Sequence, residues 1–428
     1  MRINKISIEN FKCLKSVDIE TGKLTLLTGA NSSGKSSILY GILGPLQSGE
    51  FPFQFSPNGK YVNMGNFQEM SYRHVRENIV KIGMEITDGK NPVNLSTWWE
   101  EDKVRKLPAL NKLVLDGEVY KLEIVKTKNY TLNFKISADK YPEEKFWWLN
   151  QANLKDRESH ANLTQNVEFN FDNFDDLKKK SINQDALLDS ILLSLGPLLN
   201  RLDKKINYIN SFRLFPERTY YETTKTDLTV GKFGEDYVNQ VISWQTQGVK
   251  EYKDLIKIMK SLSLLEEIKS KRLEGGRFEL VVKVNKKSVP CSLNDVGFGI
   301  SQFLPVIVAD LQLGEESTLF VAQPEIHLHP SVQADFGTYM IDRAKRSKKN
   351  YIIETHSEYL LNRIRLAVVN GDIPKEDVKI FYLKNDGEDV QTYQLEFTND
   401  GQILNAPEDF FKTYQMDVMN IAISAAGE

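Results

Sequence analysis

The stretch TLLTGANSSGKSSILYGIL, residues 25–43, decides the fold that the rest of the chain must accommodate. An apolar strand-like run leads into a glycine-rich loop, and Ile38, Leu39, Ile42 and Leu43 then recur with the spacing of one helix face. The loop fits G-x-x-x-x-G-K-[ST], a pattern that needs a preceding strand and a following helix. Because glycines let successive N–H groups face phosphates, the stretch predicts a site for a nucleoside triphosphate.

The residue types within this loop indicate how it would hold a nucleotide. Lys35 supplies a point charge for the outer phosphates, and the Ser36 hydroxyl is a natural oxygen ligand for Mg²⁺. The cofactors that the sequence predicts are therefore ATP and Mg²⁺. The predicted nucleotide-binding residues of the loop are Gly29, Ala30, Asn31, Ser32, Ser33, Gly34, Lys35, Ser36 and Ser37.

The segments on both sides of the loop predict an α/β fold. Residues 2–11 alternate like a strand, and residues 16–30 read as a turn and a second strand. Between 66 and 139 strand-like runs alternate with Gly and Asn, which indicates an antiparallel sheet. Residues 141–205 then shift to aromatic and polar loops followed by a helix, and they are the best candidate for an insertion.

The last third of the chain returns to alternating strands and helices. A helix is predicted over 250–272, where Leu255, Ile258 and Met259 recur at helical spacing. Strand and helix patterns then alternate from 277 to 385, which favours a parallel sheet with helices on its faces. The predicted domains are the first half of the nucleotide-binding fold at 1–90, an insertion of strands, loop and helix at 91–206, and the second half at 207–428, including the helix over 250–272.

Composition limits the classes of function. The 428 residues are 41% hydrophobic and 26% charged, and no run approaches the roughly 18 apolar residues of a membrane helix. With no secretory signal and only Cys13 and Cys291, the sequence predicts a cytoplasmic protein without a membrane partner. The net charge of -3 gives no overall attraction to nucleic acid, so DNA contacts would need local basic clusters such as 178–180, 285–287 or 344–349.

Three C-terminal segments follow in a fixed order. LNDVGFGISQFLPVIV at 293–308 is a glycine turn that opens an apolar helix, which is a way to hold a phosphate. TLFVAQPEIHLHP at 318–330 and KNYIIETHSEYLLNRI at 349–364 are each a buried strand that ends in polar residues. Since polar residues at the carboxyl ends of parallel strands usually face the ligand, these segments predict the rest of the nucleotide site.

The phosphate loop and these three segments, in this order, resemble ABC-type ATPase heads of the RecF, SMC and overcoming-lysogenisation-defect group. The match is strongest to compact prokaryotic ATPases of that group, often linked to phage defence, that carry GFG.SQ, QPE.HLHP and ETHSE. The resemblance covers roughly 1–87 and 207–428 and leaves the middle unexplained. It implies an ABC-type P-loop ATPase head, a mixed sheet with flanking helices and an inserted middle region. It also implies a homodimer in which two heads sandwich two ATP molecules.

The resemblance assigns further roles to single residues. Lys12 matches a basic residue that reaches the nucleotide phosphates, and His356 matches the switch histidine that senses the γ-phosphate. Gln68, chosen over Gln47 and Gln54, would contact the metal and the attacking water. Residues 328–330 stand where the dimer-crossing loop belongs. The signature that closes over the partner's γ-phosphate supplies Asp295, Gly297, Phe298, Gly299, Ser301 and Gln302, although Asn294 and Asp295 stand where a serine is more usual.

Ala322 departs from the family pattern. The strand normally ends in an acid that binds magnesium, followed by the residue that polarises water, and here these positions hold Ala322 and Gln323. A methyl group cannot bind metal, and a neutral amide is a poor general base. Glu325 or Glu354 could substitute, the site could have decayed naturally, or Ala322 could be an engineered replacement of an acid. The last is favoured because every other motif is intact, and the predicted catalytic set is Gln323, His356 and Glu325 with the acid at Ala322 missing.

The sequence thus predicts a hydrolysis-impaired ATPase that acts as a switch. ATP would join two heads and so control a separate effector protein, a nuclease or a toxin, in prokaryotic antiphage defence. The alternative is a DNA-repair or structural ATPase whose closed heads clamp duplex DNA, which salt-dependent affinity would reveal. A transporter-driving head is disfavoured, since the chain has no coupling membrane segment.

Two other patterns have competing interpretations. His327 and His329 lie two apart and could share one strand face as zinc ligands, but a metal role is disfavoured because no third ligand is clustered with them. Tryptophans in the middle region could form a partner surface, although core packing is favoured; they are Trp98, Trp99, Trp147 and Trp148.

Overall fold

The computed structural model describes residues 2–49, 51–88, 91–117, 120–126, 130–136, 167–171, 204–221, 229–407 and 410. The chain divides into two compact units, each with its own sheet. Unit 1 comprises Met1–Thr21 and Ser36–Ile206, and unit 2 comprises Gly22–Lys35 and Asn207–Glu428. The phosphate loop therefore belongs to unit 2, although the helix that follows it continues into unit 1.

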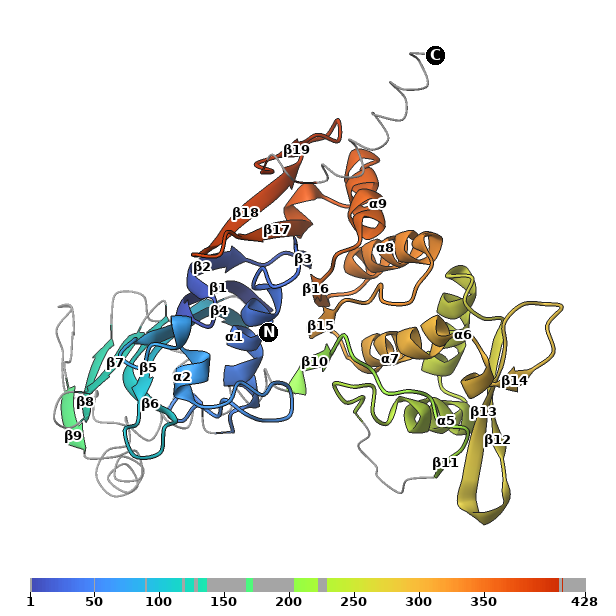
Figure 1. The fold of residues 1–428 in the computed structure, drawn as a ribbon, viewed down its shortest axis with the longest axis horizontal. Helices are drawn as coiled ribbons and strands as arrows, with labels where there is room; N and C mark the ends of the chain where they lie inside the picture. Colours follow the sequence, from blue (N-terminus) through green and yellow to red (C-terminus); the bar gives the residue numbers. More distant parts are fainter. Residues whose placement is uncertain are drawn as a thin grey trace, which may run out of the picture. The chain divides into compact units, whose positions relative to one another are not determined.

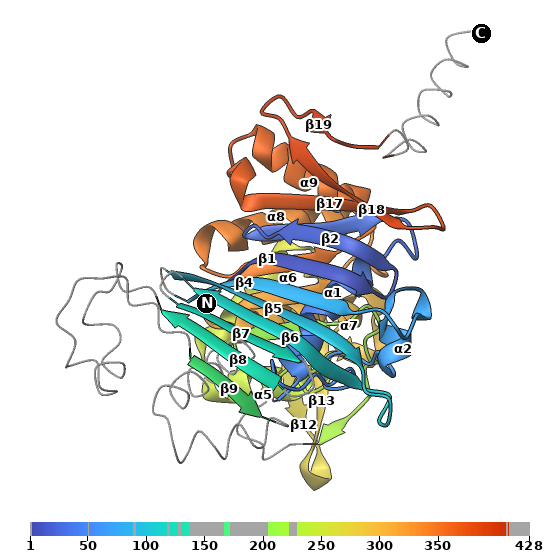
Figure 2. The same ribbon diagram turned by 90° about the vertical axis from the view of Figure 1, so that its left-hand side faces the viewer.

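Unit 1 is built on an antiparallel sheet with the order β2-β1-β4-β5-β6-β7-β8-β9 (Figure 2). Alternating exposure along β1 shows why the strands form, since one face packs on the core while the other faces solvent. The strands are β1 (Arg2–Phe11), β2 (Leu14–Glu20), β4 (Val80–Asp88), β5 (Asn91–Glu101), β6 (Pro108–Gly117), β7 (Tyr120–Lys126), β8 (Tyr130–Ile136) and β9 (Val167–Phe171). The predicted antiparallel sheet is confirmed.

Short helices and aromatic side chains complete unit 1. Helix α1 (Lys35–Gln47) approaches β1 closely, because a Cβ at Gly41 would lie 2.5 Å from the Ile8 side chain. Helix α2 (Phe67–Met70) starts with a capping box, and a 3₁₀ turn (Tyr72–His74) follows it. Trp99 is fully buried against Phe51 and Phe55, as the core interpretation predicted.

Trp98 is half-buried, and the ammonium groups of Lys81 and Lys112 lie 5.6 and 5.5 Å from its ring centroid. It therefore has neighbours within its own sheet. Trp147, Trp148 and nearly all of the helix predicted at the end of 141–205 lie outside the described residues.

Unit 2 is built on a sheet with the order β10-β15-β16-β3-β17-β18-β19. Strands β15, β16, β3 and β17 are parallel, whereas β18 is antiparallel to β17. All residues of β3, β15 and β16 are buried, as expected for strands covered on both faces. The strands are β3 (Leu24–Gly29), β10 (Ile206–Ile209), β15 (Thr318–Ala322), β16 (Asn350–Glu354), β17 (Val378–Asn385), β18 (Val390–Phe397) and β19 (Ile403–Leu404).

Helices join these parallel strands, which confirms the predicted alternation. Figure 1 shows α8 and α9 lying together beside the sheet, and Phe303 of α7 packs edge-on against Phe336 of α8 with ring centroids 5.0 Å apart. The helices are α5 (Tyr237–Gln247), α6 (Lys250–Ser261), α7 (Phe298–Gln312), α8 (Pro330–Arg346) and α9 (Glu358–Val369), with 3₁₀ turns at Glu274–Gly276, Leu293–Asp295 and Lys375–Asp377.

A second, antiparallel sheet in unit 2 corrects two predictions. It contains β11 (Tyr220–Tyr221), β12 (Glu267–Arg272), β13 (Arg277–Lys283) and β14 (Cys291–Ser292), so the strand predicted at the start of 277–385 does not join the parallel sheet. The helix predicted over 250–272 ends at Ser261. Ser263 takes a left-handed φ of 55°, and Ile268 is then buried in a strand that pairs with β13.

A further correction concerns residues 16–30. The sequence predicts a turn and one strand there, but the first part of this segment belongs to β2, which pairs with β1. The segment therefore contributes to two strands, β2 and β3. The predicted domain limits at 90 and 206 stay predictions; strands β4 and β5 pair with each other on either side of residue 90. Within the described ranges, no helix combines the length and apolar character needed to cross a membrane.

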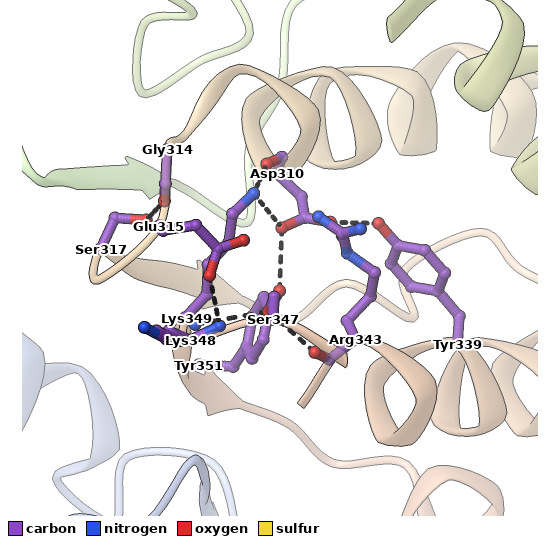
Figure 3. A network of polar contacts seen from close by, with 10 residues as sticks. All are labelled: Asp310, Gly314, Glu315, Ser317, Tyr339, Arg343, Ser347, Lys348, Lys349 and Tyr351. Atoms are coloured by element: carbon purple, nitrogen blue, oxygen red, sulfur yellow. Dashed lines mark hydrogen bonds and ion pairs between the residues drawn. The ribbon is translucent and has the colours of Figure 1, made fainter. Parts of the chain in front are cut away.

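A cluster of buried polar side chains joins α7, α8 and β16 inside unit 2, and we call it the Asp310 cluster (Figure 3). Asp310 is 1% exposed, and its carboxylate accepts hydrogen bonds from Tyr339 and from Tyr351, the latter at 3.0 Å. Arg343 Nε lies 2.8 Å and Lys349 Nζ 3.4 Å from the same carboxylate. The cluster comprises Asp310, Tyr339, Arg343, Lys349 and Tyr351.

Candidate nucleotide-binding site

The backbone of the phosphate loop requires glycine at both glycine positions of the pattern. Gly29 has φ of 141°, and a Cβ there would lie 2.1 Å from the Leu383 carbonyl oxygen of the neighbouring strand β17. Gly34 has φ of 98°, which side-chain-bearing residues rarely adopt. The Asn385 amide also donates to the Ser32 carbonyl at 3.1 Å, so the end of β17 supports the loop.

Lys35 is held inside the loop by the loop's own oxygens. Its ammonium donates to the carbonyls of Gly29 and Ala30 at 3.1 and 2.7 Å, and lies 3.4 Å from the Ser33 hydroxyl. Burial lowers the pKa of Lys35, and the nearby carboxylates of Glu354 and Glu325 oppose that shift. A buried ammonium beside these groups favours an anionic ligand such as a phosphate.

The carboxyl ends of β15 and β16 place two further predicted residues beside each other. Ala322 pairs in register with Glu354, which is 3% exposed. Gln323 donates its backbone N–H to the Glu354 carbonyl at 2.7 Å, and its side-chain amide lies 3.4 Å from the Glu354 carboxylate. Carboxylate and amide oxygens are the hard donors that Mg²⁺ prefers, so Glu354 and Gln323 fit this ion, whereas Ala322 offers no ligand.

Glu325 and His356 meet at the same strand ends. The backbone N–H of His356 donates to the Glu325 carboxylate at 2.6 Å. Burial raises the pKa of Glu325, and hydrogen bonds and the Arg213 charge oppose the rise. Partial burial lowers the pKa of His356, the Lys35 charge lowers it further, and a hydrogen bond with the Gly29 backbone opposes both. A neutral imidazole keeps one N–H, which can donate a hydrogen bond to a phosphate oxygen.

Arg213 is a residue of this site that the sequence interpretation missed. It follows β10, is 5% exposed, and donates from Nη2 to the carbonyls of Ala322 and Gln323 at 2.9 and 3.3 Å. Burial lowers the pKa of Arg213 to about 10, against the opposing charge of Glu325. The sequence signal that could have indicated Arg213 was a charged residue shortly after the end of the buried strand INYI, which is β10.

The predicted signature segment packs on the chain around Arg213. Gln302 is 2% exposed, and its amide donates to the carbonyls of Arg213 and Leu214 at 3.4 and 3.2 Å. Asp295 pairs with Arg218 at 2.6 Å. Gln302 is therefore engaged inside its own unit, although it was predicted to bind nucleotide.

The glycines and aromatic ring of the signature have separate surroundings. The Phe298 ring lies tilted against the Phe215 ring, with centroids 4.8 Å apart, and edge-on to His327, with centroids 4.7 Å apart. A Cβ at Gly299 would lie 2.6 Å from the His327 carbonyl, whereas a Cβ at Gly297 would have open space. The Ser301 hydroxyl donates to the Phe298 carbonyl at 2.8 Å, within the first turn of α7.

Lys12 and Gln68 lie near each other in unit 1. Lys12 has φ of 50° and donates its N–H to the Met70 carbonyl of α2, the helix that carries Gln68. The Lys12 ammonium lies 5.7 Å from the Tyr40 ring centroid, and burial lowers its pKa. The Gln68 side chain accepts a hydrogen bond from Arg76 at 2.9 Å.

Ser36 and Ser37 lie at the start of α1, and Gln47, which was not chosen as the metal-contacting glutamine, lies at its end. Ser36 is exposed, and the Ser37 hydroxyl lies 3.4 Å from the Cys13 sulfur. Gln47 binds the backbone of residues 56, 61 and 62 through its amide, so it is committed to that loop. The nucleotide roles of Ser36, Ser37, Lys12 and Gln68 stay predictions.

The histidine pair does not have the geometry on which the zinc alternative depended. Strand β15 ends at Ala322, and His327 has a left-handed φ of 64°, so the two imidazoles do not share a strand face. His329 caps α8 by accepting the Ser331 N–H. Across the described part of the chain, no group of three or more His, Cys, Asp or Glu side chains is arranged to hold a metal.

Comparisons with known proteins give one family, one distant curated relative and several solved structures with similar folds. The family model described as the AAA ATPase domain matches residues 1–361. Endonuclease GajA of Bacillus cereus is 23% identical over 376 residues, which are 84% of this chain and 56% of that protein. The chain thus spans little more than half the length of this curated relative.

Among solved structures, the SMC head domain from Thermotoga maritima is similar with a TM-score of 0.39 and 11% identity, covering 92% of this chain and 100% of that one. The Smc head domain with an extended coiled coil, bound to the C-terminal domain of ScpA derived from Pyrococcus furiosus, is similar with a TM-score of 0.43 and 12% identity. In that comparison 92% of this chain and 96% of the other are covered.

Proposed function

The chain belongs to the AAA ATPase domain family, and from that premise we propose that it is an ATP-driven switch that dimerises through ATP and controls a separate effector. The family match confirms the motif resemblance on which the ABC-type P-loop ATPase fold was predicted. ATP hydrolysis is the general activity of such domains. The effector, the dimer and the state of hydrolysis in this chain are our proposals.

One observation supports the ATP site above all others, namely the convergence of charged groups in unit 2. The charges of Glu354 and Glu325 act on the pKa of Lys35, and the charge of Lys35 acts on the pKa of His356. These groups come from three chain segments that the parallel sheet brings to one edge. The carboxyl ends of parallel strands are where open α/β sheets bind ligands.

The residues at this edge divide into two proposed roles. Lys35, the loop N–H groups and His356 hold and sense the phosphates, while the start of the loop helix at Ser36 supplies a hydroxyl for Mg²⁺. Gln323 and Glu354 orient the attacking water and provide oxygen donors for the metal. Bound Mg²⁺ would supply charge stabilisation of the leaving phosphate. Because the side chain of Ala322 contributes no oxygen, we expect this chain to bind ATP better than it hydrolyses it.

We propose that the effector is a separate protein. The motif resemblance points to compact ATPases of phage defence, which makes a nuclease or toxin partner the proposal for this chain as well. The purified chain alone should therefore not cut DNA.

The proposal is tested by measuring Mg-ATP binding by calorimetry and particle mass by light scattering, with and without ATP. Lys35→Ala should abolish ATP binding and any ATP-dependent rise in mass. Lys286→Ala, an exposed lysine outside the site, is the matched control and should behave like the unmodified chain. Failure of the unmodified chain to bind ATP would refute the proposal.

The effector is sought among proteins that co-purify with the native chain. Metal-dependent DNA cleavage by the chain alone would overturn the separate effector. ATP-dependent, salt-sensitive affinity for duplex DNA, without a protein partner, would support the DNA-clamp alternative instead.

A further inference from the structure

Arg213 is a buried cation whose hydrogen bonds are only partly satisfied. Its Nη2 donates to the carbonyls of the last residue of β15 and of the residue after it, at positions 322 and 323. Nε and Nη1 have no hydrogen-bond partner in the portion of the chain that the structure describes. Because unpaired buried donors cost free energy, packing alone is a poor explanation for an arginine at this position.

The backbone of the same residue is linked to the signature helix. Gln302, in the first turns of α7, donates to the carbonyls of Arg213 and Leu214. The Leu214 N–H in turn donates to the Phe233 carbonyl at 2.8 Å, which anchors the segment on its other side. A displacement of the start of α7 would therefore act directly on Arg213.

The guanidinium is linked to the residues proposed to orient water. Gln323 has a left-handed φ of 46°, an uncommon conformation that surrounding contacts must hold. Its carbonyl accepts from Arg213, while its amide lies against Glu354. Arg213 also lies close enough to Glu325 for each charge to act on the other, and Glu325 accepts the His356 N–H.

We propose that Arg213 is a positioning residue for ATP hydrolysis, which couples Gln302 of the signature helix to the turn that carries Gln323. The inference rests on the proposed ATPase function. Arginine suits this role because its planar fork can hold two carbonyls in fixed directions, whereas the lysine ammonium is a flexible point charge. Arg213 acts through Gln323 and does not itself contact the phosphates in this proposal.

The test uses the full chain, with and without Ala322→Glu, and compares kcat with the dissociation constant for Mg-ATP. Arg213→Lys keeps the positive charge and loses the planar guanidinium. We expect kcat to fall by about tenfold or more, and tenfold corresponds to about 1.4 kcal/mol of activation free energy. ATP affinity and melting temperature should stay close to those of the parent. Arg346→Lys is the matched control, because Arg346 is exposed and pairs with Asp342 within α8.

Gln302→Met provides a second variant that leaves Arg213 in place and removes its link to α7. It should lower kcat by a similar factor, and the double variant should be no slower than the worse single variant, because both break one coupling. Losses of kcat that add up in the double variant would show that Arg213 and Gln302 act independently, which contradicts the inference. Equal losses of kcat, ATP affinity and melting temperature would mean that Arg213 has only a structural role. An unchanged kcat in Arg213→Lys overturns the inference alone, whereas absence of ATP turnover in both parents overturns the proposed hydrolysis and the inference together.

Discussion

Two buried charged clusters flank the same strands of unit 2 and differ in the partner of their cations, which is a carboxylate within ion-pair distance in one and backbone carbonyls in the other. At the amino end of β16, the Asp310 carboxylate has two cations and two phenol groups around it (Figure 3). At the carboxyl end of β15, the Arg213 guanidinium binds two backbone carbonyls and leaves Nε and Nη1 unpaired within the described residues.

The difference indicates different roles for the two ends of the sheet. A carboxylate with two cations and two phenol groups around it fixes α7, α8 and β16 against each other. Arg213, which faces backbone carbonyls, lies where parallel strands present residues to ligands. Disrupting the first should therefore reduce stability, and changing the second should alter ATP turnover while the fold persists.

The largest expected effect lies at the carboxyl end. Ala322→Glu should raise ATP hydrolysis by orders of magnitude, because charge stabilisation by a bound metal contributes several kcal/mol to the transition state. Steady-state phosphate release measures it, and Ala322→Gln, similar in size but neutral, is the control. An unchanged rate with Glu would refute the engineered origin of Ala322 and leave Glu354 or Glu325 as the acid in use.

At the amino end, Asp310→Ala should lower the free energy of unfolding by about 3–5 kcal/mol, because it leaves the buried Lys349 and the partly buried Arg343 without their counter-charge. Denaturant unfolding measures this loss, and the folded fraction should bind ATP with unchanged affinity. Asp342→Ala breaks an exposed ion pair and should change stability by less than about 1 kcal/mol. A large loss of ATP affinity in folded Asp310→Ala would erase the contrast between the clusters.

A smaller effect should separate hydrogen bonding from charge within the Asp310 cluster. Tyr351→Phe removes one donor to Asp310 and retains the aromatic packing, so the free energy of unfolding should fall by about 1–2 kcal/mol. Burial and the Asp310 charge raise the pKa of Tyr351, so the loss should be constant between pH 6 and 9, where the phenol stays protonated. A loss that varied across this range would mean that another group titrates in the cluster.

The smallest expected effect is a pH dependence at the carboxyl end. Because the pKa of His356 is lowered in the folded chain, the unfolded state takes up a proton first, at its ordinary pKa of about 6.5. His356 should therefore reduce stability as the pH falls through 6.5 towards its folded pKa. His356→Gln should unfold with a weaker pH dependence between pH 7.5 and 5.5, measured by denaturant titration, and an identical dependence would contradict the shift.

Local sequence patterns predicted the parts of the site whose residues are neighbours along the chain. The phosphate loop and the strand ends at Ala322 and Glu354 are visible because a buried strand and a polar turn leave contiguous signals. Residues 262–272 were not predictable in the same way, since Leu262, Leu265 and Ile268 repeat at a helical spacing while Ile268 is buried in a strand. Pairing with β13 decided the outcome, and no local pattern shows it.

Arg213 shows a second limit of sequence reasoning. Its partners are main-chain carbonyls, 109 and 110 residues away along the chain, and a carbonyl has no side-chain identity to recognise. The buried position of Gln302 was missed for the same reason, because its acceptors are also backbone oxygens. Side-chain types predicted which chemistry is present, but tertiary contacts determine which groups are already engaged.

The position of β3 has a consequence for synthesis of the protein. This strand ends at Gly29, whereas its sheet neighbours β16 and β17 begin at Asn350 and Val378, so they are made long after it. A nascent chain that stops before residue 350 carries the phosphate loop on a strand without either neighbour. We therefore expect a chain truncated before residue 350 to lack an ordered ATP site.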